Sequence, residues 1–175
     1  IRRSTGNATP AEKAQIETPA LHWADLSRDD YGISLLTFSK YGFDVKGHTI
    51  RLSLLRSPKW PDPLADRGRH RIPYALYPHA GRWSDAETTR RGLEYNAPLL
   101  AVTAGRHAGP APARTDRLRV EPANLVLTTL KKAEDGEGWI LRWYDGAGRD
   151  SVAQITLPRA PKTAVLSNSL EEDGA

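Results

Sequence analysis

A series of short runs rich in aliphatic and β-branched residues most limits what this chain can fold into. The runs lie at residues 33–38, 49–56, 71–78, 124–132, 139–145 and 152–158, and Gly, Pro, Asp and Asn separate them. Runs of this length and composition are typical of β-strands. Ile50, Leu52 and Leu54 alternate with polar residues, which indicates one buried and one solvated strand face. The pattern predicts an all-β fold, an antiparallel β-sandwich.

Two of these stretches predict hairpins. Residues 34–58 place apolar runs on both sides of a Lys40-Tyr41-Gly42 corner. Residues 139–158 form the clearer case, because an Asp-Gly-Ala-Gly turn separates the two runs.

One short helix is predicted within residues 84–96. Ser84 is a favourable N-cap, acidic residues follow it in the first turn, and Arg90 and Arg91 come later. This order of charges suits the helix dipole.

The length of 175 residues allows one domain with a sizeable core. Residues 1–22 show no period and predict an extended lead-in, and residues 23–175 predict the sandwich domain. The absence of methionine, even at residue 1, predicts that the chain is part of a longer polypeptide.

Composition narrows the function classes. The net charge of +4 is spread from Arg2 to Arg159 among acids, so no nucleic-acid partner is predicted. No apolar run approaches a membrane span or a signal peptide, so no membrane partner is predicted either. The lack of cysteine excludes disulfides and thiolate metal sites and favours a reducing, cytoplasmic location.

Asp62, Asp66 and His70 recur at a spacing of four and offer oxygen and imidazole ligands for a divalent cation. Only a helix would align them, and Pro61 and Pro63 oppose a helix. The favoured interpretation is a turn at Arg67-Gly68 capped by Asp66, with no metal bound.

Two groups of aromatic side chains are candidate sugar platforms, since the C–H faces of hexoses pack on flat rings. They are Tyr74, Tyr77, His79 and Trp83 in one stretch, and Trp139 and Trp143 in another. The alternative, which we favour, is that these rings fill the core and that His79 bonds a neighbouring backbone group.

Longer motifs at residues 22–36, 39–81 and 120–145 are similar to those of a known protein family. They contain WADLS, KYG, LLRSP, YALYPH and KKAEDG in this order. Together they resemble the C-terminal β-rich region of family 38 glycoside hydrolases, the class II α-mannosidases, of the bacterial and cytosolic type. The resemblance covers roughly residues 2–172 and implies a sandwich of the galactose-mutarotase-like, or supersandwich, type.

The resemblance implies a retaining mechanism with an aspartate nucleophile and a zinc ion, both in an N-terminal α/β domain. No part of this sequence resembles that domain, and the family's closing strand would follow residue 175. The chain is therefore expected to hold no catalytic residue and no cofactor of its own. Its expected partners are the catalytic and helical domains of the same enzyme and mannose-containing glycans.

The resemblance also implies that Lys40, Tyr41 and Asp44 lie on a loop that faces the cleft of the absent domain. Tyrosine offers a flat face and a hydroxyl, and Lys and Asp can bond sugar hydroxyls. The family shows an Asn-Asp type pair where this chain has Thr37-Phe38, and the apolar Phe38 makes a hydrogen-bonding role toward the cleft unexpected there. The structural alternative is a hairpin in which Gly42 allows the bend and Lys40 pairs with Asp44.

Two other function classes stay open. A stand-alone carbohydrate-binding module would need exposed, coplanar aromatic rings and a complete fold. A self-sufficient metallo-hydrolase would need clustered His and Asp ligands, and the five histidines are scattered.

Overall fold

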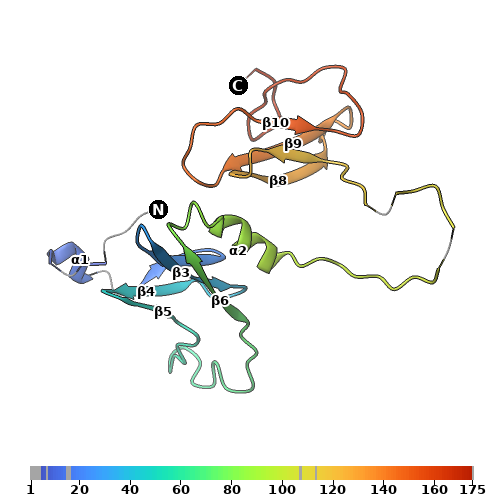
Figure 1. Ribbon diagram of the computed structural model, residues 1–175. Helices are drawn as coiled ribbons and strands as arrows, with labels where there is room; N and C mark the ends of the chain where they lie inside the picture. Colours follow the sequence, from blue (N-terminus) through green and yellow to red (C-terminus); the bar gives the residue numbers. More distant parts are fainter. Residues whose placement is uncertain (1–4, 7, 15–16, 107, 113, 175) are drawn as a thin grey trace. The chain divides into compact units, whose positions relative to one another are not determined.

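The computed structural model describes residues 5–6, 8–14, 17–106, 108–112 and 114–174. Its contacts divide the chain into two compact units, residues 1–100 and 101–175, which we call unit 1 and unit 2 (Figure 1). The single domain predicted for residues 23–175 stays a prediction. Parts of the predicted lead-in (residues 1–4, 7 and 15–16) and of the linker (107 and 113) lie outside the described residues.

In its described residues, unit 1 contains six strands and two helices, and the first helix lies within the predicted lead-in. Their bounds are α1 Pro10–Ala14, β1 Thr18–Pro19, β2 Trp23–Ser27, β3 Tyr31–Thr37, β4 Gly42–Lys46, β5 Thr49–Leu52, β6 Tyr74–Ala80 and α2 Thr88–Asn96. The strands form two antiparallel sheets, ordered β1-β4-β5 and β2-β3-β6. The prediction of an antiparallel β-fold is confirmed, with two short helices instead of one.

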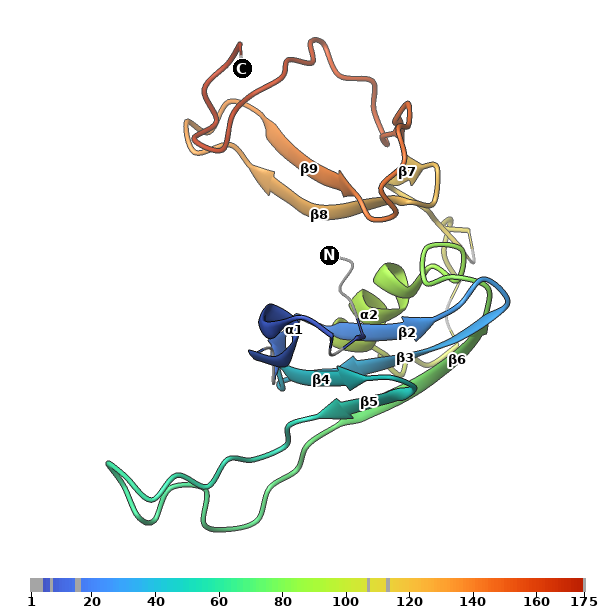
Figure 2. The same cartoon turned by 90° about the vertical axis from the view of Figure 1, so that its left-hand side faces the viewer.

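The predicted hairpin over residues 34–58 is wrong, because β3 and β4 belong to different sheets (Figure 2). The hairpin is β4–β5, where Lys46 pairs with Thr49 around Gly47. The segments β1–β2 and β3–β4 instead run side by side as one ribbon that passes from one sheet into the other. Backbone bonds from Ala20 N to Tyr41 O (2.9 Å) and from Thr37 N to His22 O (2.8 Å) hold this crossing. Such strand switches are how sheet corners are made.

The helix α2 begins four residues later than its predicted N-cap. Ser84 lies in a turn, where Asp85 N and Ala86 N bond to Arg82 O. The residue before the helix, Glu87, is left-handed (φ 53°) and provides no side-chain cap. The first turn consequently holds no acid, and the predicted charge order along the helix is wrong.

The core of unit 1 lies around β3 and β4. Leu35, Leu36 and Phe43 are buried. The alternation of β5 is confirmed at Ile50 and Leu52, which are half-buried beside exposed Arg51, and it is wrong at Leu54, which follows the strand and is exposed.

Unit 2 consists of β7 Arg119–Glu121, β8 Leu125–Lys132, β9 Trp139–Asp145 and β10 Gln154–Thr156. The predicted hairpin over residues 139–158 is wrong here too, because β9 pairs with β8 and β10 pairs with β7. The predicted turn does form, because the Asp145 carboxylate accepts a hydrogen bond from the Ala147 amide at 2.9 Å. The chain after them nevertheless leaves β9.

The last described residues form a C-terminal hook (residues 166–174). Asn168 Oδ1 accepts the amides of Leu170 and Glu172, and Ser167 bridges to Asp173. Glu171 fastens the hook to the β8–β9 turn, because its carboxylate bonds Lys131 Nζ at 2.7 Å and the Glu134 amide at 2.9 Å.

Candidate functional site

A hollow of about 480 Å³ lies at the corner where the chain passes between the two sheets of unit 1. We call it the corner hollow. It is lined by Glu17, Pro19, Ser39, Lys40, Tyr41, Gly42, Ser53, Leu54, Leu55, Arg56 and Asp66. A hollow of this size lies within the range of small-molecule sites.

The structure brings two of the three predicted site residues to this hollow. Lys40 and Tyr41 line it, and the Tyr41 side chain is half exposed. Asp44 does not line it. The Asp44 carboxylate instead bonds Arg51 Nε at 2.8 Å on the neighbouring strand, so the pairing of Asp44 with Lys40 is wrong.

The structure requires glycine at residue 42, although not for the backbone bend that was predicted there. Its φ is not left-handed. A Cβ atom at this position would lie 2.1 Å from Glu17 Oε1 and 3.3 Å from the Ser53 Cβ. Glycine therefore permits the Glu17 carboxylate to lie against the backbone of β4.

The carboxylates of the hollow are held by other groups of unit 1. Arg56 pairs with Glu17 Oε2, and Asp66 Oδ2 accepts the Ser57 amide at 2.9 Å. Glu17 Oε1 is buried without a hydrogen-bond partner among the described residues. With cations, an acceptor and an exposed ring, the hollow can hydrogen-bond and stack a sugar.

Thr37 and Phe38, just before the corner, differ in their surroundings. Thr37 is fully buried, its Oγ1 accepts the Lys40 amide at 3.2 Å, and its carbonyl accepts Asn96 Nδ2 at 3.0 Å. Phe38 is exposed. Thr37 thus fixes the backbone that carries Lys40.

The predicted metal ligands do not converge. Asp62 Oδ1 accepts the Leu64 amide and His70 Nε2 lies 2.9 Å from the Asp66 carbonyl. Asp66 holds Ser57 and not the Arg67-Gly68 turn, so its predicted partner is wrong. Across the described residues, no three His, Cys, Asp or Glu side chains lie together as a metal ligand set.

The prediction that the aromatic rings fill the core is wrong for Tyr74 and Trp139, which are both exposed. Tyr77 and His79 lie on the strand face opposite Tyr74, and the Trp83 ring packs on Trp23 at 5.4 Å. The Tyr77 hydroxyl donates to the Ala86 carbonyl at 3.1 Å. In unit 2, Trp139 is 73% exposed and Trp143 is half-buried.

A buried polar network in unit 1 was missed from the sequence. It joins Asp25 of β2, Ser34 of β3, His79 of β6 and Thr88 of α2. Asp25 Oδ2 lies 2.6 Å from Ser34 Oγ and 2.7 Å from His79 Nε2, and Thr88 Oγ1 lies 2.9 Å from Ser34 Oγ. Gly32 makes room, since a Cβ there would lie 2.6 Å from the His79 ring.

The connectivity of this network excludes a Ser-His-Asp nucleophile. In such a triad the imidazole bonds the serine hydroxyl. Here both Ser34 and His79 bond the carboxylate, and the side chains of Asp25 and His79 are each 3% exposed. We assign the network a positioning role, in which Thr88 fastens α2 to the sheet.

Comparisons with known proteins show which family this chain is similar to. The model of the Glycosyl hydrolases family 38 C-terminal domain matches residues 1–64, and that of the Glycosyl hydrolases family 38 C-terminal beta sandwich domain matches residues 124–174. The second description confirms the predicted sandwich class.

The relatives cover nearly the whole chain. Alpha-mannosidase 2C1 of Mus musculus is 38% identical over 98% of this chain, and Alpha-mannosidase of Saccharomyces cerevisiae is 44% identical over 97% of it. Alpha-mannosidase G of Dictyostelium discoideum is 35% identical over 98%. The chain spans about 17% of the length of the first and second of these, and 16% of the third.

These matches define the chain first as a β-sandwich region from the C-terminal part of a glycosyl hydrolase. It matches, specifically, the C-terminal region of glycosyl hydrolase family 38 over residues 1–64 and 124–174. Within the described residues, neither helix has the length and apolar character that a membrane crossing requires.

Proposed function

We propose that this chain is the non-catalytic C-terminal β-sandwich part of a retaining α-mannosidase. In this proposal the whole enzyme hydrolyses terminal α-mannosides, and the corner hollow lends one wall to its cleft. The observation that supports the proposal most directly is the match of C-terminal family 38 models to both units of the chain. Lys40 and Tyr41 in one hollow support the second part.

The further partners are proposals of the same kind. The chain packs on the catalytic and helical domains of its enzyme, and exposed apolar side chains such as Trp139 support this role. Zinc, or another divalent cation, belongs to the catalytic domain. The described residues of this chain offer no set of ligands that would hold it. The absence of cysteine supports a cytoplasmic location.

The test uses the natural polypeptide that carries these residues. Tyr41→Ala should lower kcat/KM for a p-nitrophenyl α-mannoside about tenfold, which corresponds to the loss of one good substrate contact. Lys40→Ala should act in the same direction. Tyr31→Ala is the matched control, because Tyr31 is also an exposed tyrosine and does not line the hollow.

Four results would separate the parts of the proposal. Equal rates for Tyr41→Ala and Tyr31→Ala would remove the hollow from the cleft while leaving the family function. A comparable loss in Asp44→Ala would restore the third predicted residue. An isolated chain that hydrolyses the mannoside would refute the non-catalytic role, and one that binds mannosides without hydrolysis would favour a stand-alone carbohydrate-binding module.

A further inference from the structure

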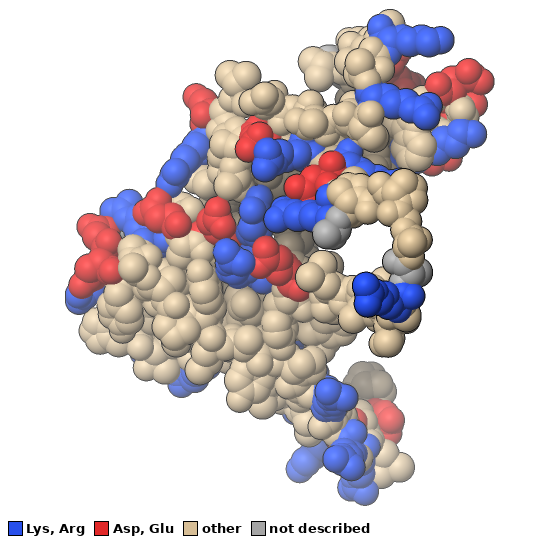
Figure 3. All heavy atoms as spheres, turned by 45° about the vertical axis from the view of Figure 1, so that its right-hand side comes forward, with Lys and Arg blue, Asp and Glu red and all other residues tan. Residues whose placement is uncertain are grey.

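The long loop at residues 53–73, which connects β5 to β6, carries a dense set of unpaired cations. Its basic side chains are Arg56, Lys59, Arg67, Arg69 and Arg71, against two acids, Asp62 and Asp66. Arg56 pairs with Glu17, whereas the other four have no ion pair within the described residues. Figure 3 shows Lys and Arg side chains gathered where this loop projects at the bottom of the view. Elsewhere in unit 1, arginines such as Arg28, Arg51 and Arg82 pair with carboxylates.

Both acids of the loop bond its own backbone, which shapes the loop. Asp62 Oδ1 accepts the Leu64 amide at 2.8 Å, and Asp66 Oδ2 accepts the Ser57 amide at 2.9 Å. The second bond closes the loop on itself, and His70 Nε2 adds a contact to the Asp66 carbonyl at 2.9 Å. Neither carboxylate forms an ion pair with a loop cation in the described structure. The cations are thus available to a ligand.

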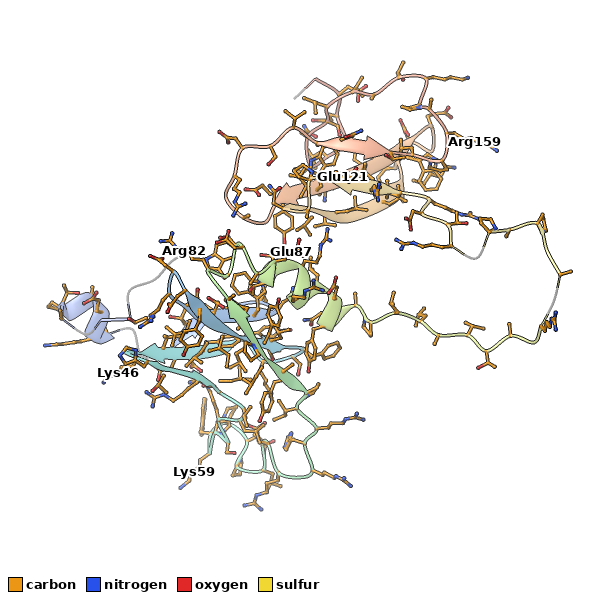
Figure 4. The ribbon with its side chains drawn as sticks, in the orientation of Figure 1. Lys46, Lys59, Arg82, Glu87, Glu121 and Arg159 are labelled. Carbon is orange, nitrogen blue, oxygen red and sulfur yellow. The ribbon has the colours of Figure 1, made fainter. Side chains whose placement is uncertain are left out.

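The same loop exposes a tryptophan beside one of these cations. The Trp60 side chain is 84% exposed, and it lies between Pro58 and Pro61, next to Lys59. Figure 4 shows Lys59 pointing away from unit 1. Prolines limit backbone freedom, so ordering this segment on a ligand costs less conformational entropy.

We propose that the loop at residues 53–73 is a second glycan-binding site, one that takes an anionic glycan carrying phosphate or sulfate esters. The guanidinium groups of Arg67, Arg69 and Arg71 present planar donor pairs, which match the oxygens of a phosphate or sulfate ester. The Trp60 indole offers the flat apolar face that a sugar ring covers.

The choice of a glycan over nucleic acid or an acidic polypeptide rests on the proposed function. It is also supported by the loop, in which Trp60 is the one Phe, Tyr or Trp residue, whereas stacking of successive bases uses several such rings. The site is separate in role from the corner hollow, although the loop also contributes lining residues to that hollow: Ser53, Leu54, Leu55, Arg56 and Asp66. Arg67, Arg69 and Arg71 are not among them.

The experiment measures binding of the natural polypeptide to a phosphorylated mannan, to the same mannan after dephosphorylation, and to heparin. Calorimetry at low and high salt is the readout, because exposed charge contacts weaken as the screening length shortens. The test variant Arg67→Ala/Arg69→Ala/Arg71→Ala should weaken binding of the anionic glycan about tenfold or more, since three charge-assisted contacts are lost. Trp60→Ala should weaken it less.

The control variant Arg117→Ala/Arg159→Ala/Lys162→Ala removes the same charge from exposed positions of unit 2 and should leave binding unchanged. Stronger binding to the phosphorylated mannan or to heparin than to the neutral mannan is the expected result, and the preferred ester identifies phosphate or sulfate. The inference is overturned by equal binding of the neutral mannan, by equal losses in both triple variants, or by tighter binding of polyglutamate or an oligonucleotide.

Hydrolysis of a neutral aryl mannoside, measured on the same samples, keeps the two proposals apart. The triple loop variant should retain its rate. Hydrolysis without anionic-glycan binding would refute this inference alone, whereas anionic-glycan binding without hydrolysis would refute the proposed function alone.

Discussion

Replacing Gly92 of α2 by alanine should destabilise the protein, although alanine is the better helix former. In an unobstructed helix interior this change gains about 1 kcal/mol. Gly92 is buried, and a Cβ atom there would lie 2.6 Å from Trp23 Cδ1 and 3.4 Å from Trp23 Cγ. Carbon atoms in contact normally lie about 3.5–4.0 Å apart. The ring or the helix must therefore move by about 1 Å to reach this separation.

The Trp23 ring has little freedom to move, because it packs on Trp83 with centroids 5.4 Å apart and an interplanar angle of 35°. Overpacking against a restrained group costs about 1–3 kcal/mol, and an overlap of this size belongs at the upper end. After the gain in helix propensity, the free energy of unfolding should fall by about 2 kcal/mol.

Urea denaturation followed by tryptophan fluorescence measures this change, with the slope of the transition as a check that the unfolded state is unaltered. Trp23→Ala is the relief variant, since it removes the Cγ and Cδ1 atoms that lie nearest to the added methyl group. In the Trp23→Ala background, Gly92→Ala should lose most of its cost. An increase in stability for Gly92→Ala alone would show that the contact with Trp23 does not restrain α2.

Two further predictions concern the core of unit 1 and the hook of unit 2. Phe43→Ala should lower the free energy of unfolding by about 3–5 kcal/mol, because the Phe43 side chain is 1% exposed. Phe38 is exposed, so Phe38→Ala should change it by no more than about 0.5 kcal/mol. Denaturation curves that reverse this order would contradict the assigned burial. The side-chain hydrogen bond from Lys131 holds the pKa of Glu171 below its ordinary value of 4.5. The contact therefore stabilises the hook fully above that value and is lost as the pH falls through the lower folded pKa. Amide exchange in the hook should rise over this acid range in the wild type, while Glu171→Gln should remove this pH step; an unchanged step in the variant would assign it to another group.

Strands β3, β5, β6, β8, β9 and β10 match runs that the sequence predicts, whereas β1, β2 and β7 and the pairing of the strands could not be predicted. Alternation in β5 and the runs in β3, β6, β8 and β9 reflect burial of one strand face, which is a local property. Pairing depends on which strand meets which edge. At Lys40-Tyr41-Gly42 the turn residues mark a crossing between sheets, and a tight turn and a crossing use similar residues.

The residues of the candidate site could also be predicted only in part. Lys40 and Tyr41 could be predicted because they lie in a sequence motif that resembles family 38. Glu17 could not, since it lies in a stretch without periodicity and reaches the hollow only through the pairing of β1 with β4. Asp25 and His79 are 54 residues apart, so no local pattern joins them. An acid on the inward face of β2 was the one available signal.

The buried network also fixes an order of events during synthesis. Its members are spread from Asp25 to Thr88, and the hydroxyl of Thr88 is the last to be made. Domains fold as units while the chain emerges from the ribosome. The nascent chain can pair β2 with β3, yet it cannot complete the network until β6 and the start of α2 have emerged. A nascent chain that ends before residue 88 leaves the Ser34 hydroxyl with Asp25 as a partner and without Thr88.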